Sequence, residues 1–286
     1  MFAHQVIEDL KKYNFKNIKL DSNVPNNFHL SLIDPIKKSH KFHFGEIKHI
    51  RSVSGSLIAK PLFQNSTYLK LPYDFCWFDY INNTKIDYDG TEIFNTKEAV
   101  LIINHKNNGN DIFEIYIFSY FKTISLWLLM PGMATLQTGI KGKNTTISGI
   151  KGLSHNHLKA LKNDFLLNLE MVEHSLKLLN CKNIITEKII APKILNKKRR
   201  KSGRVDLFDY HVLNIIVPSN KKTSNKKTEP LSHNRVHLCR GHFKEYTIEK
   251  PLFGKLTGLY WWQPHVRGQN KKGIVLKDYV VNRKGE

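Results

Sequence analysis

SHNHLKALKNDFLLNLEMVEHSLKLLN, residues 154–180, predicts the clearest helix in this sequence. Apolar side chains recur there at spacings of three and four, which places them on one face of a helix. These residues are Leu158, Leu161, Phe165, Leu169, Val172, Leu176 and Leu179. Ser154 can cap the first turn, and Asn180 is suited to end the last one. Such a stripe indicates a helix that packs against a sheet or another helix.

The chain before this helix has the features of a β-rich domain. Short apolar runs such as SLIAKPLF, AVLIINH and IFEIYIFSYF alternate with clusters of Asn, Gly, Asp and Pro, as strands and turns do. The segment LPYDFCWFDY (71–80) is dense in aromatic residues, which predicts core packing more than base stacking. The glycine-containing segment 139–154 predicts a loop or an interdomain linker. We therefore expect a β-rich domain over residues 1–150.

Four strand-like segments follow the helix, at 209–218, 235–247, 257–268 and 273–281. Their mostly short connections favour an antiparallel sheet. The sequence thus predicts an α+β fold, in which residues 151–286 form the long helix and a four-stranded antiparallel sheet.

Positive charge is concentrated in the C-terminal third of the chain. The 286 residues carry 45 Lys and Arg against 24 Asp and Glu, a net charge of +21. Residues 190–286 hold 22 of these basic residues and 7 of the acidic ones, a net +15. A basic segment of this kind favours a polyanionic partner, most often nucleic acid. A generally basic surface is the alternative.

The densest basic segment, 193–204, has seven basic residues and no acidic one. Its side chains can neutralise the phosphates of a nucleic-acid backbone, although a solvated loop or a nuclear-localisation signal can have the same composition. We expect nucleic-acid contacts from Lys197, Lys198, Arg199, Arg200, Lys201 and Arg204, and from Lys255 and Trp262 further along the chain.

Several classes of protein are excluded. No apolar run is long enough to span a bilayer, and the N-terminus lacks the apolar core of a signal peptide, so we expect a cytoplasmic protein without a membrane partner. Cys76, Cys181 and Cys239 lie far apart in the sequence, which fits a reducing compartment. No P-loop, GxGxxG fingerprint, GxSxG elbow or HExxH motif is present, and we expect no cofactor.

Acid–base chemistry is concentrated in residues 235–268, which contain three of the 14 histidines. His can transfer protons near neutral pH, Arg can hold a phosphate with two hydrogen bonds, and Tyr and Trp can stack on bases. The predicted catalytic residues are His242 with His265 or His237 as its counterpart, Arg240 and Arg267 at the phosphate, and Tyr246 at a base.

Metal binding is a weaker interpretation of the same segment. His237, Cys239 and His242 form an HxCxxH cluster of zinc-ligand residue types. On a regular strand, however, His242 lies on the opposite face from the other two. Carboxylates are also scarce in this part of the chain, which argues against a two-metal nuclease. We therefore expect no metal ion.

The C-terminal blocks resemble a group of phage and prophage proteins. The resemblance rests on NKKRRKSGR, DYHVLNI, HLCRGHFKEY, PLFGKLTGLYWWQPHVRG and KDYVV, together with the LPYDFCWFDY block, and covers roughly half of the chain. It implies a phage-associated protein in a bacterial host cell. A helix followed by a four-stranded antiparallel sheet is also similar to metal-independent ribonucleases of the barnase, EndoU and RelE-like type. This chain lacks the diagnostic motifs of those enzymes.

The leading hypothesis is a nucleic-acid-binding protein whose C-terminal domain is a metal-independent endoribonuclease. RNA is favoured over DNA because its 2′-OH serves as the nucleophile. The alternative is a non-catalytic DNA- or RNA-binding regulator, or an inhibitor of host nucleic-acid machinery. A structural or assembly protein is the third class, and the sequence leaves the oligomeric state open.

Overall fold

The computed structural model describes residues 1–12, 27–51, 69–86, 92–107, 110–130, 132–139, 142–149, 168–216, 218, 235–239, 242–262, 265–267 and 269–275. The chain divides into two compact units. The first comprises Met1–Asn180 and Ile185–Asn214, and the second comprises Cys181–Ile184 and Ile215–Glu286. The helix that the sequence predicts after Ser154 therefore belongs to the same unit as the β-rich part of the chain.

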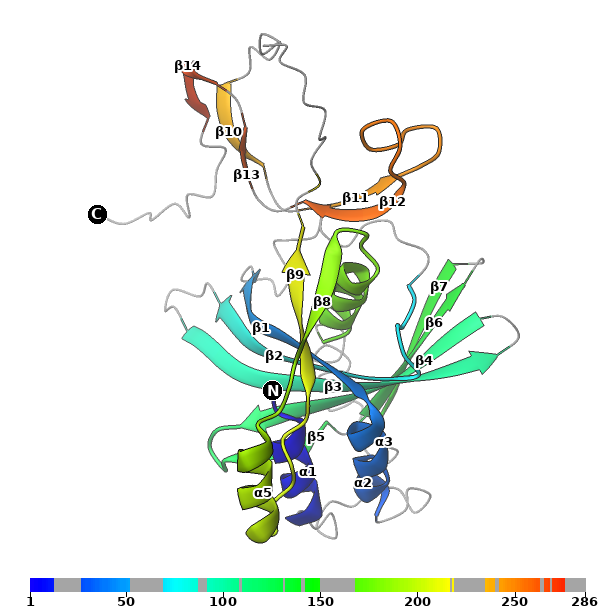
Figure 1. Ribbon diagram of the computed structural model, residues 1–286, viewed down its shortest axis with the longest axis vertical. Helices are drawn as coiled ribbons and strands as arrows, with labels where there is room; N and C mark the ends of the chain where they lie inside the picture. The colour runs from blue at the N-terminus through cyan, green and yellow to red at the C-terminus, as the bar shows by residue number, and fades with distance from the viewer. Residues whose placement is uncertain are drawn as a thin grey trace. The chain divides into compact units, whose positions relative to one another are not determined.

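The first unit is built on a large mixed sheet, and the predicted α+β class is confirmed (Figure 1). Among the described strands the order is β7-β6-β4-β3-β2-β1-β9-β8, with β5 paired to β4. Neighbours from β7 to β2 are antiparallel, whereas β1 runs parallel to both β2 and β9. The bounds are β1 His40–Arg51, β2 Phe75–Ile86, β3 Glu92–Asn107, β4 Asn110–Phe121, β5 Leu126–Leu129, β6 Gly132–Gly139, β7 Gly142–Gly149, β8 Ile184–Ile189 and β9 Tyr210–Ile215.

Strand β7 occupies much of the segment that the sequence predicts as a loop or linker, and that prediction is wrong there. All eight of its residues pair with β6. The central residues Thr145, Thr146 and Ile147 are β-branched and favour a strand. Gly142 and Gly149, two of the glycines that suggested a loop, are the first and last residues of the strand.

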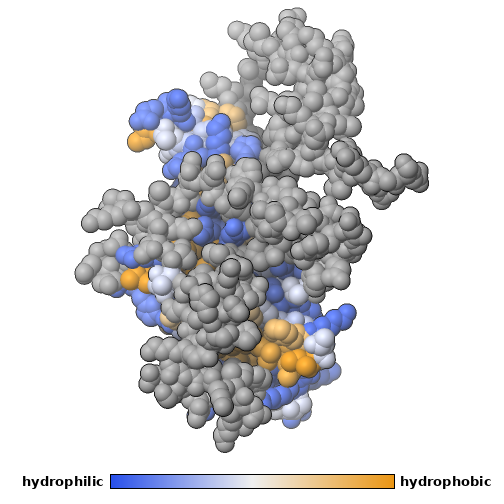
Figure 2. All heavy atoms as spheres, turned by 180° about the vertical axis from the view of Figure 1, so that it is seen from behind, coloured by the Kyte–Doolittle hydropathy of each residue, from blue (hydrophilic) through white to orange (hydrophobic). Residues whose placement is uncertain are grey.

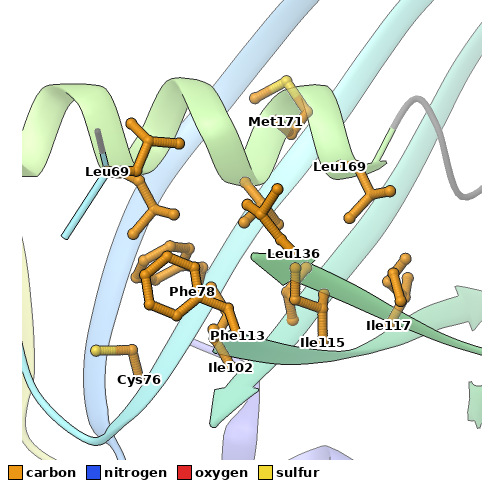
Figure 3. Packing of buried hydrophobic residues seen from close by; sticks show 14 of the residues in the cluster. Leu69, Cys76, Phe78, Ile102, Phe113, Ile115, Ile117, Leu136, Leu169 and Met171 are labelled. Atoms are coloured by element: carbon orange, nitrogen blue, oxygen red, sulfur yellow. The ribbon is translucent and has the colours of Figure 1, made fainter. Parts of the chain in front are cut away.

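One face of the large sheet is covered by the described part of the predicted helix, residues 168–179, called here the central helix (Figure 3). Alternate residues of β2 point to this face, because successive side chains of a strand lie on opposite sides. The buried cluster includes Leu169, Val172 and Leu176 of the helix and Cys76, Phe78 and Tyr80 of the strand. The helical stripe and the core assignment of LPYDFCWFDY are therefore confirmed for these residues.

Helices cover the opposite face of the sheet. They are α1 Ala3–Lys12, α2 Phe28–Ser31 and α3 Ile33–Lys38, and α5 Lys193–Lys201 is joined to α1 by the ion pair of Arg199 with Glu8 and buries no residue of its own. α1 buries Ala3, Val6, Ile7 and Leu10, whose spacing of three and four forms one apolar side, in the same cluster as Trp77 of β2. None of the helices in the described ranges is long and apolar enough to cross a membrane.

The four-stranded antiparallel sheet predicted for the C-terminal part is wrong. β9 joins the large sheet, and β11 (His242–Tyr246) pairs only with β12 (Gly258–Trp262) among the described strands. β10 (Arg235–Cys239) lies between the antiparallel β13 (His265–Arg267) and the parallel β14 (Gln269–Val275). Two of the predicted long strands thus contain two short strands each. Gly241 and Pro264, which weaken or interrupt a ladder, stand between the halves in the sequence.

Candidate nucleic-acid interface

α5 contains most of the basic run that the sequence assigns to phosphate contacts. Pro192 precedes its first residue, and the chain leaves the helix at Gly203, whose φ of +67° suits a glycine. Four basic residues lie in the last turn, where positive charge interacts favourably with the helix dipole. The run is therefore a helix and not a solvated loop.

Two residues of α5 face the rest of the first unit, and we call them its inner side. The guanidinium of Arg199 donates to Oε1 of Glu8 on α1 at 2.7 Å and to the carbonyl of Val205 at 2.6 Å. The side-chain amide of Asn196 donates to the carbonyl of Leu207 at 2.9 Å and accepts from the backbone N–H of Leu207 at 2.7 Å. The Arg199 side chain is 10% exposed. These contacts fix α5 in place, so the sequence prediction of a nucleic-acid contact at Arg199 conflicts with its structural role.

Glu8 is held in its ionised form. Burial alone would raise its pKa, but the backbone N–H of Val205 and the guanidinium groups of Arg204 and Arg199 outweigh that effect and lower the pKa of the Glu8 carboxyl. The distances are 3.0 Å from Val205 N and 3.5 Å from Arg204 Nη2. One carboxylate therefore stabilises two basic residues of the run.

His4 lies one turn before Glu8 on α1. Burial, followed by the positive charge of Arg199, lowers the pKa of His4 to about 4. Its Nδ1 atom is buried and has no hydrogen-bond partner within the described part of the chain. The ring is therefore neutral at neutral pH and adds no positive charge beside the guanidinium.

The outer side of α5 is formed by four exposed lysines, Lys193, Lys197, Lys198 and Lys201. None of the four has an ion-pair partner among the residues that the structure describes. Ile194 lies on the same face, because residues 194, 197, 198 and 201 follow the helical spacing, and it is 76% exposed. The outer side therefore presents free positive charge around one apolar side chain.

The remaining two arginines of the run are exposed like the lysines, but each lies near a carboxylate as Arg199 does. Arg200 is 3.4 Å from Asp206, and Arg204 is 3.5 Å from Glu8. Both arginine side chains are largely exposed, so each ion pair is screened by water and weak. Of the predicted phosphate contacts in this run, Lys197, Lys198 and Lys201 alone are both exposed and free of a carboxylate partner in the described ranges.

Exposed apolar residues by themselves do not mark the interface. The described surface carries hydrophobic residues beside hydrophilic ones (Figure 2), and Ile124 and Ile248 are 53% and 88% exposed elsewhere. Single exposed aliphatic residues are common on proteins. The outer side of α5 is distinguished by its unpaired lysines, not by Ile194 alone.

The predicted catalytic residues of the C-terminal strands fall into two groups. The register of β10 and β13 places His237 opposite Arg267, and Cys239 opposite His265. Directly opposed residues of an antiparallel pair belong to one face of the sheet. His242 and Tyr246 lie instead on β11, where Trp262 and Gly258 are their opposite neighbours. The structure thus brings His237, His265 and Arg267 into one sheet without His242, and Arg240 lies outside the described residues.

The other predicted contact residues of the second unit, Tyr246, Trp262 and Lys255, differ in their exposure. Tyr246 is half-buried, with its ring 5.6 Å from that of Tyr260 and with the ammonium group of Lys244 over it. Trp262 is also half-buried, and its indole N–H finds no hydrogen-bond partner in the described ranges. Lys255 is exposed in a turn in which Phe253 and Gly254 have positive φ. Of these three residues, only Lys255 is exposed.

The side chains that the structure describes include no group of three His, Cys, Asp or Glu residues able to hold a metal ion. The register also separates the members of the HxCxxH cluster, because His242 belongs to a different sheet from His237 and Cys239. This division weakens the zinc interpretation of that motif.

His43 and Asp79 form a close pair that the sequence analysis missed. Asp79 is fully buried and accepts hydrogen bonds from the backbone of Phe2 at 2.6 Å and from the indole of Trp77 at 3.1 Å. Its other oxygen lies 2.5 Å from Nδ1 of His43, the residue opposite it on β1. The carboxylate fixes the start of α1 to the sheet. The sequence signal is an aspartate inside an apolar strand, since a buried carboxylate needs donors.

Comparison of the chain with protein-family models, with curated proteins and with solved structures finds no match.

Proposed function

We propose that this protein binds nucleic acid through the outer side of α5 and cleaves RNA without a metal ion, in the cytoplasm of a bacterial host. The observation that carries the binding is the set of four exposed, unpaired lysines on a helix whose inner side is fixed. Lysines of this kind neutralise phosphates and release condensed counterions. Because Arg199 and Asn196 hold α5 in place, its lysines can bind phosphates without a loop first becoming ordered, which lowers the entropic cost of binding.

The proposed cleavage uses His237, His265 and Arg267, whose register positions lie in one sheet. One histidine takes the proton of an RNA 2′-OH, and the 2′-oxygen attacks the adjacent phosphorus. The bond from phosphorus to the 5′-oxygen breaks, and the second histidine donates a proton to that oxygen. Arg267 stabilises the charge on the phosphate. The products are a 2′,3′-cyclic phosphate and a 5′-hydroxyl, and DNA is not a substrate because it lacks the nucleophile.

The test compares three histidine variants on labelled single-stranded RNA, with and without EDTA. We expect cleavage to persist in EDTA, and His237→Ala or His265→Ala to slow it about 100-fold or more, because general acid–base groups contribute that much. His242→Ala, the matched control from the other sheet, should change the rate less than about threefold. Circular dichroism of each variant checks that it is folded. Cleavage that requires a metal ion, or that only His242→Ala removes, contradicts the proposal.

A second candidate function is a non-catalytic regulator or inhibitor that binds DNA or RNA. The outer side of α5 favours it, because lysines contact the phosphates of either polymer and no catalysis is needed. Salt-sensitive binding of both polymers without any cleavage would select this candidate. A structural or assembly protein would show no salt-dependent affinity for nucleic acid.

A further inference from the structure

We infer that α5 binds single-stranded RNA without reading its sequence. The inference rests on the proposed function and specifies which nucleic acids the outer side accepts. Two features support it: the hydrogen bonds that the polar side chains of α5 already make, and the groove geometry of duplex RNA.

The side chains of α5 that are best suited to read bases are already occupied. Sequence-specific contacts are made most often by Arg on guanine and by Asn or Gln on adenine, each with two hydrogen bonds. Both the amide oxygen and the amide nitrogen of Asn196 are hydrogen-bonded to the backbone of Leu207. The guanidinium of Arg199 is hydrogen-bonded to Glu8 and Val205, and its side chain is 10% exposed. Neither residue can read a base without releasing the helix.

The other two arginines of the basic run, of which only Arg200 belongs to α5, each form a weak and largely exposed ion pair with a carboxylate. Arg200 lies beside Asp206 and Arg204 beside Glu8. The free groups are the lysines of the outer side, whose ammonium is a point charge without the planar fork of arginine. Contacts of lysine with phosphate position a polymer but carry no sequence information. The free charge of α5 is therefore suited to the backbone and not to the bases.

The preference for single strands comes from groove geometry. The major groove of duplex RNA is deep and narrow and does not admit a helix. A single strand can instead bend until its phosphates match the lysines. Ile194, exposed among them, offers apolar surface that an unpaired base can cover, whereas the bases of a duplex are stacked inside it. Four lysine contacts predict a slope of log affinity against log salt of about −2.8 on a single strand.

The experiment measures affinities by fluorescence anisotropy with 2′-O-methyl RNA, which lacks the nucleophile and stays intact. The probes are three single strands of equal length and unrelated sequence and one duplex. The full chain is compared with Lys197→Ala/Lys198→Ala/Lys201→Ala. The matched control, Lys37→Ala/Lys106→Ala/Lys122→Ala, removes the same charge from exposed lysines elsewhere in the first unit.

We expect the three single strands to bind within about threefold of one another and the duplex about tenfold more weakly. The α5 variant should lose about 30-fold for every strand alike, and the control about twofold. A tenfold preference for one sequence overturns the inference but leaves nucleic-acid binding intact. Duplex binding as tight as that of the single strands overturns the single-strand part. Unchanged binding by the α5 variant overturns the site, and no binding of any probe overturns the proposed function as well.

Discussion

The two sides of α5 differ in what their basic residues contact. On the inner side, Arg199 meets a carboxylate and a carbonyl and is almost covered. On the outer side, Lys197, Lys198 and Lys201 are exposed without a carboxylate partner in the described ranges. In the sequence these residues form one uniform run. A count of basic residues therefore overstates the charge that is free for a ligand, because packing uses part of that charge.

The division follows the chemistry of the two residue types. The guanidinium group is planar, weakly hydrated and able to donate in several directions, so it suits a site that must join Glu8 and Val205 at once. An ammonium group is strongly hydrated and stays in water at low cost. Arginine therefore fits the inner side of the helix and lysine the outer side.

Removal of Arg199 should have the largest effect on stability. Arg199→Ala leaves Glu8 partly buried with a weaker partner and should lower the free energy of unfolding by about 3 kcal/mol. Lys198→Ala, one residue earlier and exposed, should change it by less than about 0.5 kcal/mol. Urea unfolding of the two variants beside the unaltered protein measures both values. Equal losses would show that the two sides of α5 do not differ.

His4 lies beside the inner side of α5 and should make the stability of the protein depend on pH. Its pKa is about 4 in the folded protein and about 6.5 when unfolded. The unfolded chain therefore binds the proton first, so the contribution of His4 is complete above about pH 6.5 and decreases as the pH falls toward about 4. At pH 5 the loss relative to pH 7.5 should be about 2 kcal/mol.

His4→Gln, which cannot titrate, tests this assignment. Unfolding free energies of the variant and the unaltered protein, measured at pH 7.5 and at pH 5, should show a smaller pH dependence in the variant by about 2 kcal/mol. Identical pH dependence in both proteins would mean that the environment of His4 is not the one that Arg199 and burial create.

Arg200 should show the smallest effect. Its ion pair with Asp206 is 3.4 Å long and largely exposed. Arg200→Ala should therefore change the free energy of unfolding by less than about 1 kcal/mol. Its RNA affinity should fall less than about threefold, since the free lysines remain. A larger loss of affinity than that of Lys198→Ala, measured by the same anisotropy titration, would place Arg200 among the binding residues of the outer side.

Local patterns predict elements better than they predict pairings. The stripe that includes Leu169, Val172 and Leu176 identifies the central helix, and the LPYDFCWFDY segment identifies core. The four-stranded antiparallel sheet fails because the neighbour of a strand depends on long-range packing, which no local periodicity encodes. The same holds for β1, whose parallel neighbours β2 and β9 lie far from it in the sequence.

The residues of the candidate site could also be predicted only in part from the sequence. The basic run stands out from its composition, but the assignment of Arg199 to packing needs Glu8, which lies 191 residues away. The pairing of His237 with Arg267 likewise depends on long-range register, because β11 and β12 lie between β10 and β13 in the sequence. The hydrogen-bonded role of Asp79 can be predicted from the sequence, since an aspartate within an apolar strand is buried and needs donors.

The salt dependence of RNA binding tests the central claim most directly. Affinities of the unaltered protein and of Lys197→Ala/Lys198→Ala/Lys201→Ala are measured for one single strand between about 50 and 200 mM salt. If the outer side of α5 holds the phosphates, the slope of log affinity against log salt should become shallower by about 2 in the variant, because three contacts are lost. Parallel slopes for the two proteins would contradict the account.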